Sequence, residues 1–267
     1  MHTRPPAIAG TFYPSEPGAL RRRLDACWAS RVVLDVAPPK ALIAPHAGLI
    51  YSGPIAATAY ATLAPAAARV RRVVLLGPSH HFGFSGFAIP TANVWATPLG
   101  EVALDRDALA SVAGRKDMLS SDRAHAPEHS LEVQLPFLQR VLADFVLVPI
   151  AVGEVTPSAG GELLAALWGG DETLIVISSD LSHFFDQATA QATDRQTTER
   201  IEALDADGIL HSDACGRYPI ACLLSEAQRR AMTMQTVDLR TSADTAGDPS
   251  RVVGYGSYLF WSKHEVA

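Results

Sequence analysis

The 267-residue sequence is 48% hydrophobic and 7% aromatic, with a formal net charge of −6. That length can bury a substantial core, and the negative charge disfavours a nucleic-acid-binding surface. No apolar run reaches the roughly 20 residues of a membrane-spanning helix, so no membrane contact is expected. The three cysteines, Cys27, Cys215 and Cys222, cannot form a paired disulfide framework. Together with the lack of a charged-then-apolar leader, this favours the cytoplasm.

Strand and helix patterns alternate along the chain. Helices are predicted at residues 17–31, 53–63, 102–113 (beginning near Asp105), 157–168, 188–204 and 220–232. Runs rich in Val, Ile and Leu predict buried strands at residues 40–44, 72–76, 145–152 and 173–178. This β-α-β order is typical of an α/β fold.

The remaining segments are less regular. A short β-type piece is predicted at residues 86–90, followed later by a polar loop at 120–129. Pro136 is expected to kink or interrupt the segment 130–142. Residues 233–240 and 251–261 are expected to pair as antiparallel strands. No convincing linker divides the chain, so one domain over residues 1–267 is predicted.

Histidines follow three of the predicted strands, in loops rich in Gly, Pro and Ser. His46 follows the first strand, His80 the second, and Asp180 and His183 the fourth. In open α/β sheets the ligand crevice lies beyond the carboxyl ends of the strands. Because neutral imidazole is the commonest transition-metal ligand, the pair His46 and His80, after two strands expected to be neighbours, indicates a metal-centred site.

Each of these residues also has a simpler interpretation. His46 could cap the next helix. The adjacent His80 and His81 would face opposite ways on an extended backbone, so at most one could be a ligand, while the other, His81, would pack, support the ligand or contact a substrate. Cys215 could be a buried structural thiol. It precedes a turn that enters a helix, however, and a helix N-terminus favours the thiolate that binds metal.

Acidic residues accompany the histidines. Asp180 and His183 are expected on one face of the first turn of a helix. In the simpler interpretation Asp180 caps the helix and His183 is exposed to solvent. In the chemical interpretation His183 is an acid/base residue, and Asp180 orients it or is a further metal ligand. Glu128 and His129 are candidates to support a ligand or contact a substrate, although Glu128 could be only a first-turn charge. The remaining histidines are expected at the surface: His2, His125, His211 and His264.

Several motifs, in order over nearly the whole chain, resemble the Memo family, whose bacterial and archaeal branch is known as AmmeMemoRadiSam system protein B. The motifs are Pro6-Ala7-Ile8-Ala9-Gly10-Thr11-Phe12-Tyr13-Pro14, Ile43-Ala44-Pro45-His46-Ala47-Gly48, Tyr51-Ser52-Gly53, Leu76-Gly77-Pro78-Ser79-His80-His81, Thr97-Pro98-Leu99, Glu128-His129-Ser130-Leu131-Glu132, Ser178-Ser179-Asp180, Cys215-Gly216-Arg217-Tyr218-Pro219-Ile220 and Gly254-Tyr255-Gly256-Ser257.

The resemblance implies a three-layer α/β/α fold with a mixed central sheet, as in class III extradiol dioxygenases, which open catecholic rings with non-haem Fe(II) and O₂. It also implies that His46, His80 and Cys215 match the family's metal ligands and that His183 matches the dioxygenases' acid/base histidine. Leu49 stands where many relatives carry an aromatic residue, although Tyr51 remains as a candidate to contact a substrate or to support a ligand. The family name suggests a pathway link to radical SAM and AMMECR1-like proteins.

A thiolate in place of a carboxylate changes the expected chemistry, because two His and a Cys suit Fe(II), Cu or Zn. Four functions compete: an iron-dependent redox enzyme acting on a small molecule, a zinc hydrolase, a metal-handling protein without an organic substrate, and a peptide-binding scaffold. The histidines and carboxylates around the presumed ligands, including His129, His183 and Asp180, favour the first three. Fe(II) and the redox enzyme are preferred.

Overall fold

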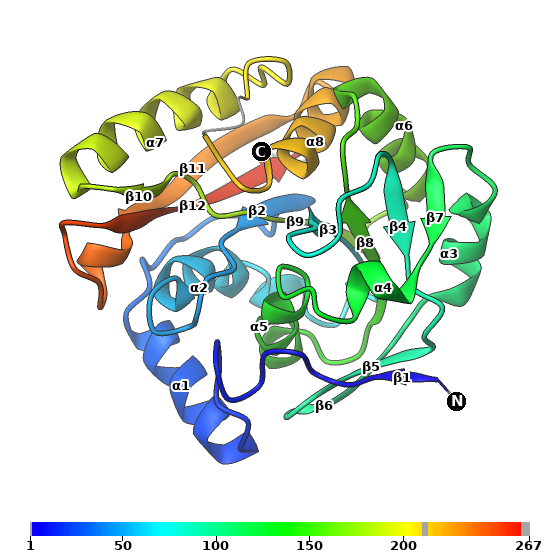
Figure 1. Cartoon of the computed structure of the whole chain (residues 1–267), viewed down its shortest axis with the longest axis horizontal. Coiled ribbons are helices and arrows are strands. Elements are labelled where there is room, and N and C mark those ends of the chain that lie inside the picture. The colour runs from blue at the N-terminus through cyan, green and yellow to red at the C-terminus, as the bar shows by residue number, and fades with distance from the viewer. Residues whose placement is uncertain (1, 210–212, 263–267) are drawn as a thin grey trace.

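The computed structural model describes residues 2–209 and 213–262 (Figure 1). The four predicted strands are confirmed as β2 (Ala41–Ala44), β3 (Arg72–Pro78), β8 (Val146–Val152) and β9 (Thr173–Ser178). They pair in parallel in the order β2-β9-β3-β8. The expectation that β2 and β3 are neighbours is wrong, because β9 lies between them.

Antiparallel strands extend this parallel core on both sides and make the sheet mixed. On one side β12 (Val252–Trp261) pairs antiparallel with β2, with β11 (Thr233–Thr241), as predicted, and with β10 (His183–Phe185). On the other side β4 (Phe87–Ile89) pairs antiparallel with β8 and parallel with β7 (Met118–Ser120). Among the described residues the main sheet has nine strands.

Helices cover both faces of this sheet. They are α1 (Pro17–Ala29), α2 (Gly53–Ala61), α3 (Arg106–Ala113), α4 (Asp122–His125), α5 (Leu135–Val141), α6 (Pro157–Leu167), α7 (Gln187–Glu202) and α8 (Arg217–Arg229), with short 3₁₀ turns at Ala64–Ala66, Glu132–Gln134 and Ser242–Asp244. Figure 1 shows α6, α7 and α8 on one face and α1, α2 and α5 on the other, which gives three layers. The predicted α/β/α arrangement is confirmed. None of the helices in the described part of the chain is long and apolar enough to cross a membrane.

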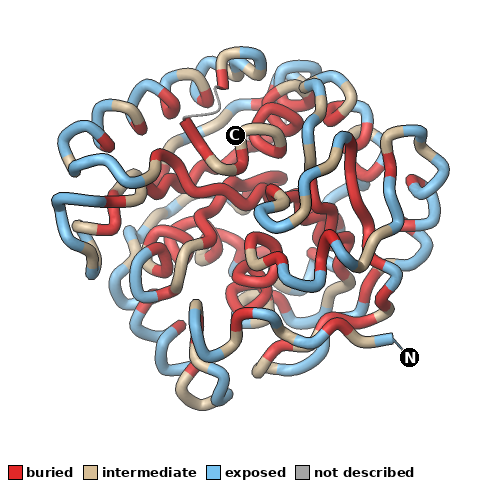
Figure 2. The backbone as a smooth tube through the Cα atoms, viewed as in Figure 1, coloured by how far each residue is buried: buried red, intermediate tan, exposed pale blue. Residues whose placement is uncertain are grey.

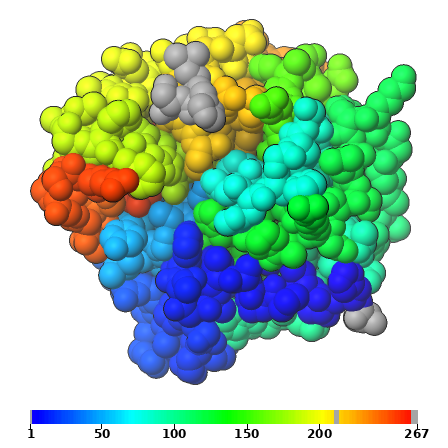
Figure 3. Space-filling view, in the orientation of Figure 1, coloured from blue at the N-terminus to red at the C-terminus, as the bar shows by residue number. Residues whose placement is uncertain are grey.

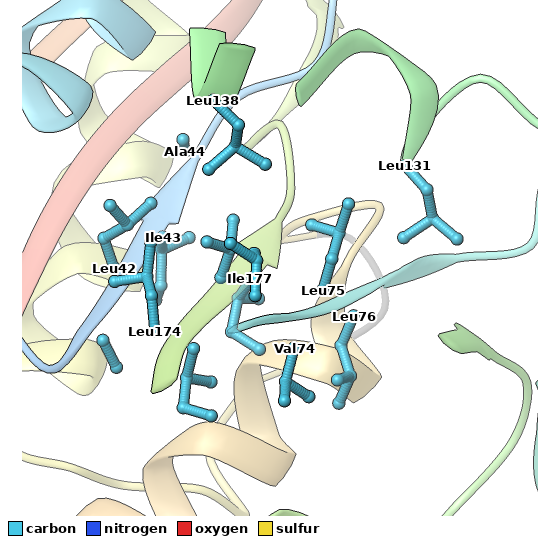
Figure 4. Packing of buried hydrophobic residues seen from close by; sticks show 14 of the residues in the cluster. Leu42, Ile43, Ala44, Val74, Leu75, Leu76, Leu131, Leu138, Leu174 and Ile177 are labelled. Carbon is cyan, nitrogen blue, oxygen red and sulfur yellow. The ribbon is translucent and has the colours of Figure 1, made fainter. Parts of the chain in front are cut away.

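The central strands are apolar because both of their faces are covered. Every residue of β2 and β9 is buried, and Figure 2 shows the buried backbone concentrated in the middle of the molecule. In Figure 4 the side chains of Leu42, Val74 and Ile177 come from three neighbouring strands and share this core. In the sequence such strands are continuous hydrophobic runs, and this local pattern makes them predictable.

One other local prediction is wrong, and two are confirmed. The helix expected to begin near Asp105 does so, because α3 begins at Arg106 with Asp105 as its N-cap. Residues 100–103 before it form β6 (Gly100–Ala103), which pairs with β5 (Val94–Thr97) beside β1 (Thr3–Arg4) in a separate small sheet. His183 lies on β10 and not on the first turn of a helix. The segment 130–142 is interrupted as expected, because a 3₁₀ turn (Glu132–Gln134) ends where α5 begins, and Pro136 lies in the first turn of α5, where a proline costs no hydrogen bond.

The N-terminal segment is held by a buried ion pair. Arg4 Nη1 lies 2.7 Å from Glu132 Oε2, and both side chains are buried. Glu132 also accepts hydrogen bonds from the backbone N–H groups of Ala7 and Ile8 and from the hydroxyl of Tyr13. In Figure 3 this segment (blue) lies against the green middle of the chain. The contact brings Phe12 against the ring of His129, with ring centroids 4.9 Å apart.

His125 is buried, which contradicts its predicted surface position. Its side chain is 1% exposed, its Nε2 lies 3.0 Å from the carbonyl oxygen of Ala88, and its Nδ1 has no hydrogen-bond partner. The ring packs edge-on to Trp95 at a centroid distance of 5.6 Å. His2 is exposed as predicted, whereas His211 and His264 lie outside the described residues.

The burial of His125 predicts a pH dependence of stability. Burial lowers the pKa of His125 from its ordinary 6.5 to about 4, so between these values the unfolded chain binds the proton more readily than the folded one. This histidine therefore lowers the free energy of unfolding as pH falls from about 6.5 to 4, by up to about 1.4 kcal/mol per pH unit. Urea unfolding at several pH values should show a shallower decline for His125→Gln than for wild type. The exposed His2→Gln is the matched control, and parallel wild-type and His125→Gln curves would contradict the prediction.

Candidate metal centre

Two histidines and a cysteine come together at the carboxyl edge of the sheet. His46 follows β2, His80 follows β3, and Cys215 lies two residues before α8. Their ligand atoms lie within 4.8 Å of one another, and His46 Nε2 is 3.3 Å from Cys215 Sγ. Nitrogen and sulfur ligands of a tetrahedral metal, bound at 2.0–2.3 Å, are themselves about 3.5 Å apart. The three residues therefore fit a transition metal.

Hydrogen bonds fix the ring nitrogen that His46 presents to Cys215. The hydroxyl of Ser178 donates to the carbonyl oxygen of Ser130 at 2.6 Å and accepts from the Gln134 amide at 2.7 Å. His46 Nδ1 lies 2.8 Å from the same Ser178 oxygen. Since that hydroxyl proton is already used, His46 must donate from Nδ1, which leaves Nε2 unprotonated and facing the thiol.

Gln134 fixes the orientation of this network in turn. Its amide oxygen accepts from the hydroxyl of Tyr60 at 2.8 Å, and its amide nitrogen donates to the carbonyl oxygen of Pro45 at 3.1 Å. Both Gln134 and Tyr60 are buried. The His46 ring is therefore oriented from behind by buried polar groups that are themselves hydrogen-bonded.

Glu128 orients His80 in the same way. His80 Nδ1 lies 2.9 Å from Glu128 Oε1, and the backbone N–H groups of His80, His129 and Ser130 donate to this carboxylate. Burial would raise the pKa of Glu128, but the hydrogen bonds that its carboxylate accepts from the His80 side chain and from backbone N–H groups help to lower it well below its usual range. Glu128 is thus an ionised acceptor, and His80 keeps Nε2 free.

Cys215 is not an activated thiol by itself. Burial, and then the nearby charge of Asp180, raise the pKa of Cys215 far above its ordinary value. Without a metal, burial thus opposes the thiolate that the start of α8 is expected to favour. A neighbouring cation is what makes a coordinating thiol lose its proton. The backbone N–H of Asp180 already donates to Cys215 Sγ at 3.3 Å.

Asp180 and His183 lie beside the three donors. The buried Asp180 accepts a hydrogen bond from the backbone N–H of His46 at 2.7 Å, and burial raises its pKa, an effect that the charge of His183 opposes. His183 is half-buried on β10 and is followed by Phe184 in the left-handed region at φ 68°. A non-glycine residue in that region is strained, which indicates that the turn is held by its surroundings.

His129 covers the other side of His80. The two rings stack with centroids 4.5 Å apart, and burial lowers the pKa of His129 to about 4. His80, Glu128 and His129 also form a second group whose ligand atoms lie within 4.8 Å. His81 is exposed, with its ring centroid 6.0 Å from that of His129, and Tyr51 is 39% exposed. His80 is exposed as well, but unlike His81 it has a side-chain hydrogen-bond partner among the described residues, Glu128.

Several residues of the centre carried no local signal in the sequence. Ser178 and Gln134 behind His46, and Phe12 against His129, were not predicted as site residues. Only the place of Ser178 at the end of a predicted strand could have indicated it. Gln134 lies inside a helical pattern, and Phe12 reaches the centre only through the N-terminal segment.

The fold and this donor cluster define an α/β protein with a potential metal centre at one edge of its sheet. The sequence matches the Memo-like protein family over residues 4–259. It is 34% identical over 272 residues to a MEMO1 family protein of Methanothermobacter thermautotrophicus, covering 94% of this chain and 98% of that protein. A MEMO1 family protein of Methanosarcina acetivorans is 36% identical over 276 residues, covering 97% and 99%. The chain belongs to the Memo family.

A solved structure also overlaps with the fold. The crystal structure of an uncharacterized protein of Escherichia coli K12, JW3007, matches 81% of this chain and 98% of its own, with a TM-score of 0.46 and 14% sequence identity.

Proposed function

We propose that this chain is a metal-dependent redox enzyme that uses Fe(II) and O₂ to oxidise a small molecule, with His46, His80 and Cys215 as the metal ligands. The observation that carries the proposal is that both imidazoles have their Nδ1 engaged, by Ser178 and by Glu128, and so offer Nε2. Such supporting partners are the usual companions of metal-binding histidines. Iron held by two histidines and a thiolate would supply one-electron and O₂ chemistry.

The chain's own residues supply proton transfer. His183 is half-buried beside Asp180, so it can exchange protons with a substrate hydroxyl and with solvent. His129 remains neutral near pH 7 because of its lowered pKa, and it offers a hydrogen bond without a charge. A pure binding scaffold needs neither group, which favours catalysis over the scaffold function.

Zinc hydrolysis is the second candidate. Two histidines, one cysteine and a water are an accepted catalytic zinc set, and the same supporting partners suit zinc. The two candidates differ in their need for O₂.

The test combines metal loading with O₂ uptake. Full-length protein is loaded anaerobically with Fe(II), its iron content is measured, and O₂ uptake is followed with a panel of catechols and enediols. We expect His183→Ala to retain iron but to lose at least about a hundredfold in turnover, the usual contribution of a general acid/base. The exposed His2→Ala is the control.

Other outcomes would reject the redox function. Stoichiometric zinc with hydrolysis that needs no O₂ would support the second candidate. Stoichiometric iron without O₂-dependent turnover of any probe would favour metal handling, and absence of bound metal would favour the scaffold.

A further inference from the structure

A cavity of about 560 Å³ opens from the candidate metal centre. His80 and Cys215 lie in its wall, which continues along the loop after β3 to Phe82 and Phe84 and across to Arg217 and Tyr218 at the start of α8. In Figure 3 the turquoise loop lies beside the gold start of this helix. The volume falls within the range of small-molecule sites, about 300–1,000 Å³.

Most of this wall is apolar, and Arg217 is its permanent cation. Phe82, Phe84, Val152 and Tyr218 supply aromatic and aliphatic surface, whereas Arg217 and Glu154 carry opposite charges. Arg217 pairs with no carboxylate in the described part of the chain, and Glu154 is exposed. A guanidinium in an apolar wall without an anionic partner is suited to an anionic ligand.

Tyr218 holds the guanidinium in place. The guanidinium carbon of Arg217 lies 4.2 Å from the centroid of the Tyr218 ring, and Nη2 donates to the Tyr218 hydroxyl. The hydroxyl and ring of Tyr218 thus occupy one nitrogen and one face of the guanidinium. The N–H groups that remain are held in a fixed orientation and form a fork of two hydrogen-bond donors. Such a fork matches the two oxygens of a carboxylate.

We infer that the substrate of this centre is a monocarboxylate with an aromatic or branched apolar body, and that Arg217 binds its carboxylate. The inference deepens the proposed function and rests on it for the identity of the centre. One fixed cation balances one negative charge, and Glu154 in the same wall repels a dianion such as a phosphate monoester. The apolar body then lies along Phe82 and Phe84, toward His80 and Cys215.

The test measures binding without metal, so that its result is independent of the redox chemistry. Chelator-treated, full-length protein is titrated calorimetrically at about pH 8, where an ordinary imidazole is neutral. The probes are phenylacetate, its neutral analogue phenylacetamide, and phenyl phosphate. Wild type is expected to bind phenylacetate about ten- to a hundredfold more tightly than the amide, the usual effect of a hydrogen bond to a charged group.

Arg217→Gln should remove this preference and leave the affinity for phenylacetamide unchanged. Arg217→Lys keeps the charge without the fork and should give an intermediate preference, which serves as a second variant if the glutamine variant fails to fold. Arg71→Gln is the matched control, because it removes the same charge from an exposed arginine. Arg71 lies just before β3, at the opposite end of that strand from His80.

Three results would overturn the inference: a preference for phenylacetate that survives Arg217→Gln, tighter binding of phenyl phosphate than of phenylacetate, or no binding of phenylacetate up to roughly 10 mM. If phenylacetate binds as expected but iron loading fails, the redox function falls and the carboxylate site stands.

Discussion

Cys215→Ala is expected to abolish tight binding of a transition metal while the protein stays folded. The thiol is one of three donor groups, and its sulfur lies 3.3 Å from His46 Nε2. Loss of a supporting residue around a metal ligand typically costs about 10- to 100-fold in affinity, so loss of a ligand should cost more. Inductively coupled plasma mass spectrometry after anaerobic reconstitution measures the effect.

Cys222→Ala is the matched control for Cys215→Ala. Cys222 is a buried thiol on α8, the helix that follows Cys215, and it faces Gly160 on α6. It should keep the wild-type metal content. Equal metal content in both variants would remove Cys215 from the donor set and direct attention to His80, Glu128 and His129.

Glu132→Gln is expected to lower the free energy of unfolding by about 3–5 kcal/mol. The substitution leaves the buried Arg4 guanidinium without its counter-charge and weakens the acceptor used by the backbone N–H groups of Ala7 and Ile8. Desolvation makes an unpaired buried charge far more costly than a broken surface ion pair. Urea denaturation measures the loss.

The double variant Arg4→Met/Glu132→Gln distinguishes the loss of stability caused by an unpaired charge from the loss caused by altered packing. If the cost comes from an uncompensated guanidinium, the double variant should be more stable than Glu132→Gln alone. A loss below about 1 kcal/mol in the single variant, typical of an exposed pair, would contradict the buried ion pair.

The strands of the parallel core were predictable because their signal is local. β2 and β9 are buried on both faces and therefore read as uninterrupted apolar runs. The errors arose where pairing partners decide the conformation. His183 lies on β10 because that segment pairs with β12, about seventy residues later in the chain, and no local pattern shows this contact.

The candidate donors could be predicted because each follows a strand or opens a helix, and topology brings such positions together. Their supporting residues could not be predicted in the same way. Ser178 and Gln134 act through hydrogen bonds between distant segments, and the burial of His125 depends on Trp95 and on Arg4, which donates to its carbonyl oxygen. The pKa of Cys215 depends on burial, which the residues adjacent to it do not indicate.

The position of β12 also sets the order in which the centre can form during protein synthesis. β12 pairs with β2, the strand that leads into His46, yet it is the latest of the described strands along the chain. Cys215 is made 169 residues after His46, a delay of roughly 10–30 s at about 5–20 residues per second. The donor set thus exists only once Cys215 has been translated, and the strand that pairs with β2 follows later still. A metal would then be captured late in synthesis or afterwards, and the ions available at that time would decide which metal the protein carries.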